Sequence, residues 1–261
     1  MALIAMAVYD TEENGRTWMT EATLQSLMDT VDLEKHRLVV VDNGSCDATQ
    51  DMYLKFIDPE LFTLIQMNRN VGTAVAINAA WKLRKDGEAC IKMDNDVVIH
   101  NPGWVDLMEE AFGRDDKLGI LGLKRKDLEE CPWSPVPWYR SALRMLPHAP
   151  GMRWIIVEDV NHVMGTCQAY SPALLRKIGY LYQMQDEGNL YGFDDSLASA
   201  RSQKAGFINS FLHGVEIDHI DNGTSKFSGW KRDNAGKWID RYLRVKQEYL
   251  DGTRLLYWED K

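Results

Sequence analysis

Residues 89–96 read Ala89-Cys90-Ile91-Lys92-Met93-Asp94-Asn95-Asp96, a short apolar run that ends in two aspartates. A run of this length is typical of a buried strand. Similar runs cover Leu3 to Tyr9, Arg37 to Val41 and Phe62 to Gln66, with helix-like segments between them. Strand–helix alternation of this kind predicts an α/β fold with a mostly parallel sheet and right-handed crossovers. Ligands of such sheets bind at the carboxyl ends of the strands, where Asp42 and Asp94 fall.

The composition indicates an ordinary globular protein, because 45% of the 261 residues are hydrophobic and 26% are charged. The formal net charge of −9 means that any contact with nucleic acid would need a local basic patch. The four cysteines are far apart and form no Cys-x-x-Cys pair, so we expect reduced thiols and a cytoplasmic protein. No apolar run reaches about 18 residues, so no membrane-spanning helix is expected.

The stretch from residue 124 to 154 differs from the rest of the chain, because it holds five of the eight prolines together with several tryptophans and arginines. A stretch of this kind is either a functional loop or a surface excursion that packs its own aromatic side chains. Beyond it, we expect a strand pair over Ile155 to Val163, helices over Pro172 to Ile178 and Ser196 to Ala205, a strand over Phe207 to Ile217, and an amphipathic helix over Trp230 to Leu250.

Asp94 and Asp96 stand two residues apart at the end of a strand. In an extended chain this spacing directs both carboxylates to the same side. Neighbouring carboxylates repel each other, so they favour a bound divalent cation, and oxygen ligands suit Mg²⁺ or Mn²⁺. The alternative is a polar turn in which the aspartates accept backbone hydrogen bonds. The spacing alone does not decide between these two interpretations.

The chain resembles the GT-A glycosyltransferases of the family-2 type in five ordered motifs between about residues 3 and 225. The motifs are Val39-Val40-Val41-Asp42-Asn43-Gly44-Ser45-Cys46-Asp47-Ala48-Thr49, Asn70-Val71-Gly72 followed by Ala76-Ile77-Asn78, Lys92-Met93-Asp94-Asn95-Asp96, Gly165-Thr166-Cys167, and Tyr191-Gly192-Phe193-Asp194-Asp195-Ser196-Leu197. The resemblance implies a Rossmann-like GT-A fold: a mostly parallel central sheet, flanking helices and a small antiparallel sheet on the acceptor side. It also implies transfer of a sugar from a nucleotide-sugar donor, with UDP favoured.

The resemblance assigns donor-site roles to individual residues. Asp42 would bind the nucleobase, Asp94 the ribose, and Asp96 a metal ion that bridges the diphosphate. The remaining donor-side residues it implies are Ala7, Tyr9, Asp10, Asn70, Gly72 and Asn95. The family's usual arginine before Asn78 is Ile77 in this chain, and Arg69 is a candidate replacement.

Asp195, with Asp194 beside it, is the candidate general base, since inverting transfer needs a carboxylate to take the proton of the acceptor hydroxyl. The alternative is that one of the two aspartates caps the helix that follows. His219 precedes a polar turn, and the resemblance suggests that it joins Asp96 as a metal ligand, which would favour Mn²⁺. A histidine in such a turn can equally be an ordinary polar residue.

The acceptor is not identified by the sequence. Trp133, Trp138 and Gly165 are the candidate acceptor-side residues, and a run of basic residues near the C-terminus is either a solvated helix face or a contact for an anionic acceptor. A glycan, a lipid-linked glycan and hydroxymethylated DNA all remain open. We divide the single domain into a nucleotide-sugar-binding half (1–123), an acceptor-side loop (124–154) and an acceptor-binding half (155–261).

Two other functions remain open at this stage. A nucleotidyltransferase would also use paired carboxylates on an α/β sheet, but it would normally show a glycine-rich phosphate loop. Gly15-Arg16 resembles such a loop only weakly. A non-catalytic sugar- or nucleotide-binding module would bind a ligand without turnover. No dinucleotide-binding glycine motif or Walker A sequence is present.

Overall fold

The computed structural model of the chain describes residues 1–56, 62–126, 142–184, 189–221, 223 and 226–256. The strands are β1 (Ala2–Val8), β2 (Arg37–Asp42), β3 (Phe62–Gln66), β4 (Ala89–Met93), β5 (Val97–Ile99), β6 (Leu118–Arg125), β7 (Ala142–Met145), β8 (Ile156–Val160), β9 (Cys167–Tyr170) and β10 (Ile208–His219). The helices are α1 (Thr17–Thr30), α2 (Asp47–Tyr53), α3 (Thr73–Trp81), α4 (Trp104–Arg114), α5 (Pro172–Ile178), α6 (Asp194–Lys204) and α7 (Lys226–Asp251).

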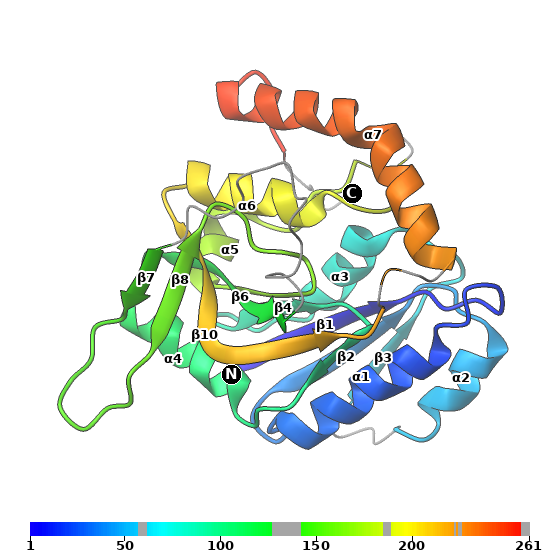
Figure 1. Cartoon of the computed structure of the whole chain (residues 1–261), viewed down its shortest axis with the longest axis horizontal. Helices are drawn as coiled ribbons and strands as arrows, with labels where there is room; N and C mark the ends of the chain where they lie inside the picture. The colour runs from blue at the N-terminus through cyan, green and yellow to red at the C-terminus, as the bar shows by residue number, and fades with distance from the viewer. Residues whose placement is uncertain (57–61, 127–141, 185–188, 222, 224–225, 257–261) are drawn as a thin grey trace.

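All ten of these strands join one sheet, in the order β3-β2-β1-β4-β9-β6-β10-β8-β7, with β5 paired to β10 (Figure 1). Strands β3, β2, β1 and β4 are parallel to one another. Strand β9 runs antiparallel to both β4 and β6, and β7 and β8 extend the sheet in antiparallel fashion beyond β10. The predicted α/β fold with a mostly parallel central sheet and flanking helices is therefore confirmed.

The sheet is buried on both faces, and β1 shows why its sequence is apolar without alternation. Ile4 and Met6 pack into one core cluster with Leu24 of α1 and Met108 of α4, whereas Leu3 packs into a second cluster on the opposite face. That second cluster contains residues of α3, α5 and α6. Helices thus cover both faces of the sheet, and the ends of the strands are the parts that they leave uncovered.

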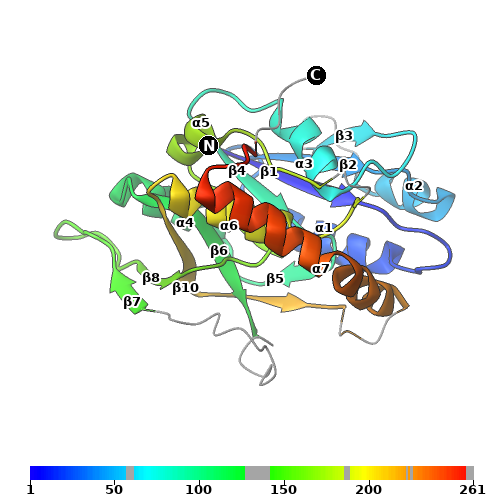
Figure 2. The same ribbon diagram turned by 90° about the horizontal axis from the view of Figure 1, so that it is seen from above.

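Helix α7 lies along α6 at the top of the molecule (Figures 1 and 2). A small third cluster holds it there, in which the ring of Tyr242 stacks on that of Phe193 with centroids 4.4 Å apart. The hydroxyl of Tyr242 also hydrogen-bonds that of Ser196 in α6. No helix among the described residues has both the length and the apolar composition needed to cross a bilayer.

The structure differs from the sequence-based expectation in the second half of the chain. Residues Ile155 to Val163 contain the single strand β8 rather than a strand pair, because the partners of β8 are the distant strands β7 and β10. Strand β7 itself lies inside the stretch that was expected to be irregular. Helix α6 begins at Asp194 rather than Ser196, and α7 at Lys226 rather than Trp230.

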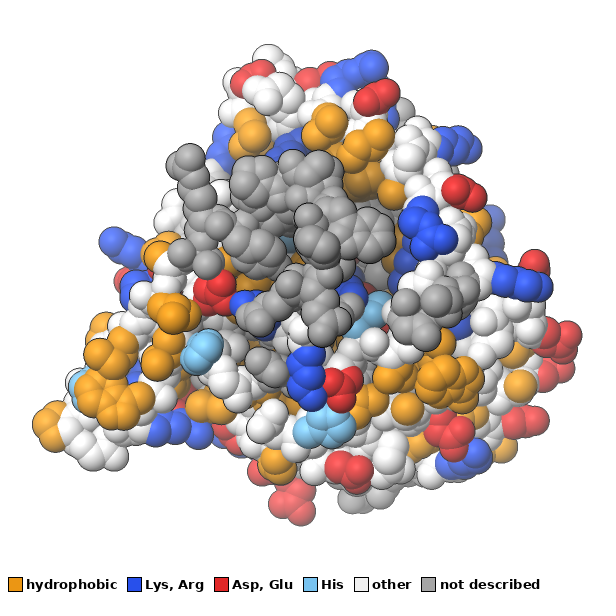
Figure 3. Space-filling view, viewed as in Figure 1, with side chains coloured by type: hydrophobic (Ala, Val, Ile, Leu, Met, Phe, Trp, Pro, Cys, Tyr) orange, Lys and Arg blue, Asp and Glu red, His pale blue; other side chains and the backbone are white. Residues whose placement is uncertain are grey.

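The β7–β8 hairpin protrudes from the far end of the sheet, and hydrophobic side chains gather on it (Figure 3). Its exposed apolar residues are Leu143, Met145, Met152, Trp154 and Ile156. Because β7 is the last strand in the sheet order, the hairpin is separated from β1 and β4 by several strands.

Candidate functional site

Acidic side chains gather where the central strands end. Asp10 follows β1, Asp42 closes β2 and Asp94 follows β4. Strand β1 pairs in parallel with both β2 and β4, so the carboxyl ends of all three strands lie at the same edge of the sheet. The structure therefore brings these three residues to one edge, as expected for a ligand site of this fold class.

Strand pairing brings His219 to Asp96. Strand β5 begins directly after Asp96 and pairs with the end of β10, which places His219 opposite Val97. The backbone N–H of Ile220 donates to the carbonyl of Asp96 at 2.9 Å. As a result, Nε2 of His219 lies 3.5 Å from Oδ2 of Asp96, although the two residues are far apart in sequence.

Two cations balance the charge of Asp96. The guanidinium of Arg16 donates to Oδ2 of Asp96 at 2.6 Å and to Oδ2 of Asp221 at 2.5 Å. The ammonium of Lys231 lies 3.7 Å from Oδ2 of Asp96. Burial alone would raise the pKa of the Asp96 carboxyl, but the contacts with His219, Lys231 and Arg16 outweigh burial and hold this pKa well below its ordinary value. Asp96 is therefore ionised although it is almost fully buried.

Two buried polar atoms at this point have no hydrogen-bond partner among the described residues: Oδ1 of Asp96 and Nδ1 of His219. A buried polar atom without a partner needs an explanation, and a bound ion or water is one of those that suit a carboxylate beside an imidazole. An ionised carboxylate beside an imidazole is a donor set that suits Mn²⁺, and Mg²⁺ also accepts the carboxylate oxygen. The residues present at Asp96 and His219 therefore fit a divalent cation.

A buried lysine connects the 94–96 turn to the start of α6. The ammonium of Lys92 donates to the carbonyl of Gly165 at 2.8 Å and to Oδ1 of Asp94 at 3.2 Å, and it lies 3.5 Å from Oδ2 of Asp194. Burial would lower the pKa of Lys92, but Asp194 and Asp94 raise it well above its ordinary value. Burial also raises the pKa of Asp194, against the attraction of Lys92. Asp194 thus serves here as a counterion for Lys92.

Asp195 is held by three groups. Its Oδ2 accepts a hydrogen bond from the backbone N–H of Gly165 at 3.0 Å and lies 3.5 Å from Nε2 of His162, and its Oδ1 accepts from the N–H of Ser196 at 2.7 Å. Burial raises the pKa of Asp195, but the contact with His162 outweighs it and lowers this pKa to about 2. With 26% of its side chain exposed, Asp195 is an ionised carboxylate that solvent can reach.

The capping alternative receives partial support, because Oδ1 of Asp195 accepts from the backbone N–H of Ser196 in the first turn of α6. The residue at the N-cap position of α6 is Phe193, in the left-handed region with φ 66°, and no side chain caps the helix there. Asp194 and Asp195 are the first two helical residues, where their negative charge also favours the positive end of the helix dipole.

Gly165 is a glycine because two functional side chains approach its backbone. A Cβ at this position would lie 2.7 Å from Nζ of Lys92 and 3.4 Å from Oδ2 of Asp195.

We expect Gly165→Ala to displace Lys92, to lower stability by about 1–3 kcal/mol as overpacking does, and to reduce turnover. Gly113→Ala is the matched control, because a Cβ there meets no atom within 4 Å and alanine favours its helix, α4. Equal melting temperatures for Gly165→Ala and wild type would contradict this account.

Asp10 and Asn95 form an internal link at the sheet edge. Oδ1 of Asp10 accepts from Nδ2 of Asn95 at 2.9 Å, and Oδ2 accepts from the hydroxyl of Thr20 at 2.6 Å. These bonds join the end of β1 to α1 and to the 94–96 turn. Of the other residues expected near the nucleoside, Ala7 of β1 is half-buried, and Tyr9, which follows β1, is 39% exposed.

Asp42 already has partners within the protein. Its Oδ2 accepts from Nε2 of Gln50 at 2.7 Å and from the N–H of Ser45 at 3.3 Å, and the hydroxyl of Tyr53 lies 3.4 Å from Oδ1. A nucleobase bound at Asp42 would have to share or replace these bonds.

The Asn70–Gly72 segment is ordered against the same edge. Oδ1 of Asn70 accepts from Nδ2 of Asn43 at 3.0 Å and from the N–H of Gly72 at 2.9 Å. Gly72 has φ 93°, and a Cβ there would lie 2.1 Å from Nε2 of Gln183, so only glycine fits. Arg69 is exposed. Its backbone packs closely against Gly44, because a Cβ on Gly44 would lie about 3.0 Å from backbone atoms of Arg69.

Two of the predicted acceptor-side residues, Trp133 and Trp138, lie outside the described residues. The third, Gly165, lies beside Asp195. Ile77, which stands where the resemblance leads one to expect an arginine, is fully buried in the core with α3.

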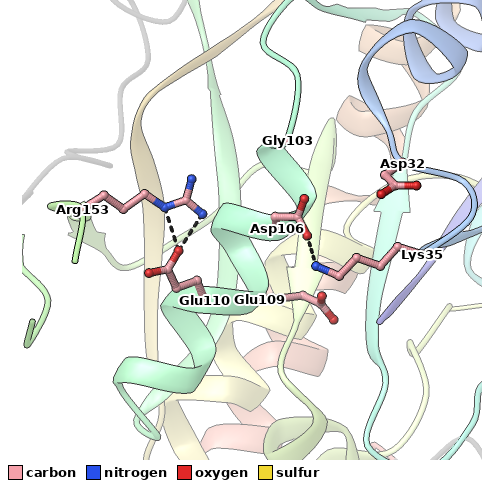
Figure 4. Close-up of a pocket in the computed structure, with 7 residues that line it drawn as sticks. All are labelled: Asp32, Lys35, Gly103, Asp106, Glu109, Glu110 and Arg153. Atoms are coloured by element: carbon pink, nitrogen blue, oxygen red, sulfur yellow. Dashed lines mark hydrogen bonds and ion pairs between the residues drawn. The ribbon is translucent and has the colours of Figure 1, made fainter. Parts of the chain in front are cut away.

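A second group of potential metal ligands lies elsewhere. His36, Asp106 and Glu109 place one ligand atom each within 4.8 Å of one another. Asp106 and Glu109 also line an open pocket (Figure 4). His36 precedes β2, so this group lies at the amino ends of the strands. Its atoms already have partners: Lys35 pairs with Asp106, and Nδ1 of His36 accepts from the N–H of Ala2. These pairings leave little reason for a metal ion there.

Comparison with known protein families decides the classification. Residues 18–179, more than half of the chain, match the family described as glycosyl transferase family 2. The chain belongs to glycosyl transferase family 2. The match contains Asp42, Asp94 and Asp96, whereas Asp195 and His219 follow it in the sequence. No curated protein gave a significant match to the chain.

Solved structures confirm the GT-A fold. A mannosyltransferase from Pyrobaculum calidifontis, PcManGT, solved with GDP-Man and Mn²⁺, is 17% identical, with a TM-score of 0.64 over 88% of this chain and 59% of that one. S. aureus TarS 1–349 with UDP-GlcNAc is 18% identical, with a TM-score of 0.58 over 85% and 61%. GalNAc-T7 with UDP, GalNAc and Mn²⁺ is 14% identical, with a TM-score of 0.59 over 100% and 53%. This family-2 chain thus spans about three fifths of the first two proteins and about half of the third.

Several residues that the structure places at the site give little or no signal in the sequence. They are Arg16, Lys92, His162, Asp221 and Lys231. Lys92 stood inside a quoted motif, and a charged residue in an otherwise apolar strand was a usable signal. Arg16 follows a glycine before a helix, which is a weaker signal. Asp221 gave none, and Lys231 stood out only as one of the basic residues near the C-terminus, because only the β10 pairing and the docking of α7 bring them to Asp96.

Proposed function

We propose that this family-2 protein is a metal-dependent glycosyltransferase that transfers a sugar from a nucleotide-sugar donor to a hydroxyl acceptor. The observation that carries the proposal is the pair Asp96 and His219 at the carboxyl edge of the sheet, with an orphaned ligand atom on each. Family membership supports the same reaction class, and two of the similar structures contain Mn²⁺.

Asp96 and His219 would hold the cation, for which we favour Mn²⁺ because imidazole suits it. When bound, such an ion supplies positive charge that stabilises the departing nucleoside diphosphate. Asp94 and Asn95 directly precede Asp96 on the same turn, and we assign Asp94 to the ribose of the donor. Asp42, Asp10 and Arg69 line the neighbouring strand ends, where we place the nucleoside, with UDP as the favoured nucleotide.

Asp195 is the proposed general base. As the acceptor oxygen forms its bond to the anomeric carbon, the bond from that carbon to the diphosphate breaks, and its electron pair leaves with the nucleoside diphosphate. The acceptor proton passes to the carboxylate of Asp195, and this direct displacement inverts the anomeric configuration. The low pKa of Asp195 keeps it ionised and ready, and the proton moves only as attack develops. Its partly exposed position beside Gly165 supports placing the acceptor there.

A thermal-shift screen of nucleotide sugars in the presence of Mn²⁺ tests the proposed function. At a concentration one hundred times its Kd, a donor stabilises the fold by about 2.7 kcal/mol, which raises Tm by roughly 5–10 °C for a chain of this size. We expect one nucleotide class to give this shift and EDTA to remove it. An incubation with the stabilising donor should then release nucleoside diphosphate, whereas release of pyrophosphate would indicate a nucleotidyltransferase instead. Absence of any Mn²⁺-dependent shift across the panel would refute the proposal.

A further inference from the structure

Lys231 lies where the first part of α7 meets the turn of Asp96. Its ammonium is 4.8 Å from the ring centroid of Phe227 and 5.8 Å from that of Tyr191, so two aromatic faces hold it. Phe227 also covers the guanidinium of Arg16 at 4.5 Å. The side chain of Lys231 is 24% exposed, so it lies at the boundary between the buried charge cluster and solvent.

The ammonium of Lys231 has unused hydrogen-bonding capacity. It carries three N–H donors, yet it donates no hydrogen bond to any residue that the structure describes, and its one ion pair, to Asp96, is long at 3.7 Å. Aromatic faces attract a cation without accepting a directed N–H bond. The arrangement therefore positions a cation and leaves its donors available to an anion.

The charges around Asp96 indicate what that anion is. In the structure, the carboxylates of Asp96 and Asp221 are balanced by Arg16 and Lys231. A divalent cation bound to Asp96 would leave this cluster with an excess positive charge. A diphosphate, which carries several negative charges and many acceptor oxygens, restores the balance and satisfies the free donors of Lys231.

We propose that Lys231 is a donor-binding residue that contacts the diphosphate of the nucleotide sugar, with Phe227 and Tyr191 holding its ammonium in place. This inference rests on the proposed function and adds to it a residue of α7, a helix that lies beyond the family-2 match. It also changes the interpretation of the C-terminal basic residues, because Lys231 faces the donor side rather than an anionic acceptor.

Isothermal titration calorimetry on wild type, Lys231→Ala and Lys231→Arg tests this role. The probes are Mn²⁺ alone and then UDP or GDP, whichever stabilises wild type, in saturating Mn²⁺. Lys237→Ala is the matched control, since Lys237 is on the same helix and also packs on an aromatic ring, that of Trp238 at 5.2 Å. This control removes the same charge and the same kind of aromatic contact, with no ion pair to Asp96.

Lys231→Ala should raise the Kd of the nucleoside diphosphate about tenfold or more, as expected for loss of a charge-assisted hydrogen bond. It should leave the Kd of Mn²⁺ alone unchanged or lower, because it removes a positive charge beside Asp96. Lys231→Arg should recover part of the diphosphate affinity, and Lys237→Ala should match wild type.

The opposite pattern overturns the inference. Equal diphosphate affinity in Lys231→Ala and wild type would show that Lys231 does not contact the diphosphate. Parallel weakening of Mn²⁺ and diphosphate would mean that Lys231 only supports the structure around Asp96. If wild type binds neither nucleotide, the proposed function fails as well, so the failures of the two proposals are distinguishable.

Discussion

Asp96→Asn is expected to lower the rate of sugar transfer at least about a thousandfold, a loss of roughly 4 kcal/mol of transition-state stabilisation. The amide keeps the size of the side chain but removes the negative charge that attracts a divalent cation. Oδ1 of Asp96 and Nδ1 of His219 are the orphaned atoms assigned to the cation, and this variant replaces the charged ligand of the two with a neutral one. Nucleotide binding in this variant should no longer respond to Mn²⁺.

Transfer rates and nucleotide Kd values with and without Mn²⁺ check this expectation. Asp106→Asn is the control, because Asp106 belongs to the ligand group at the amino ends of the strands and pairs with Lys35 (Figure 4). Asp106→Asn should retain both activity and metal dependence. Melting temperature without metal must also be measured, since Asp96→Asn weakens the pair with Arg16 and a merely unfolded protein would mimic the loss. A folded Asp96→Asn variant with full activity would eliminate the proposed site.

Asp195→Asn is expected to reduce kcat by about 10²–10⁴-fold, the usual contribution of a general base, while donor affinity stays near that of wild type. The amide can still accept the hydrogen bond from the N–H of Gly165, so the local structure should survive. Only the capacity to take the acceptor proton is lost. Since the pKa of Asp195 is about 2, its ionisation should not limit activity at any pH above about 4.

Asp194→Asn provides the comparison for this prediction. Asp194 is buried against Lys92, and its loss leaves a buried cation with one partner fewer. We therefore expect Asp194→Asn to lower the melting temperature more than Asp195→Asn does, and to lower kcat less. If Asp194→Asn instead lost more kcat than Asp195→Asn at equal stability, Asp194 would be the general base and Asp195 would not. Product anomers analysed by NMR complete the test, because retention of configuration would remove Asp195 from its role as base.

The parallel half of the fold could be predicted from the sequence because its signals are local. Strands β1 to β4 are short, largely apolar runs followed by polar residues, and they pair in parallel with one another. The strand ends then place Asp42 and Asp94 at one edge without further information. Asp96 joined them because it follows Asp94 by two residues.

The second half could not be predicted as well, because its elements depend on distant partners. Strand β7 is short and exposed, and only its pairing with β8 makes it a strand. The contact of Arg16 with Asp96 and Asp221 spans 80 and 205 residues, so no spacing rule in the sequence indicates it. In the sequence, Lys231 cannot be distinguished from the surface lysines of an amphipathic helix, because its contact with Asp96 depends on how α7 packs.

Anomalous X-ray scattering at the manganese edge, from crystals grown with Mn²⁺ and the nucleoside diphosphate that binds best, tests the central claim most directly. The account predicts a manganese peak coordinated by Asp96 and His219 and by oxygens of the diphosphate. A peak found only beside His36, Asp106 and Glu109, or a nucleotide bound with no ion while Arg16 remains paired with Asp96, would contradict it.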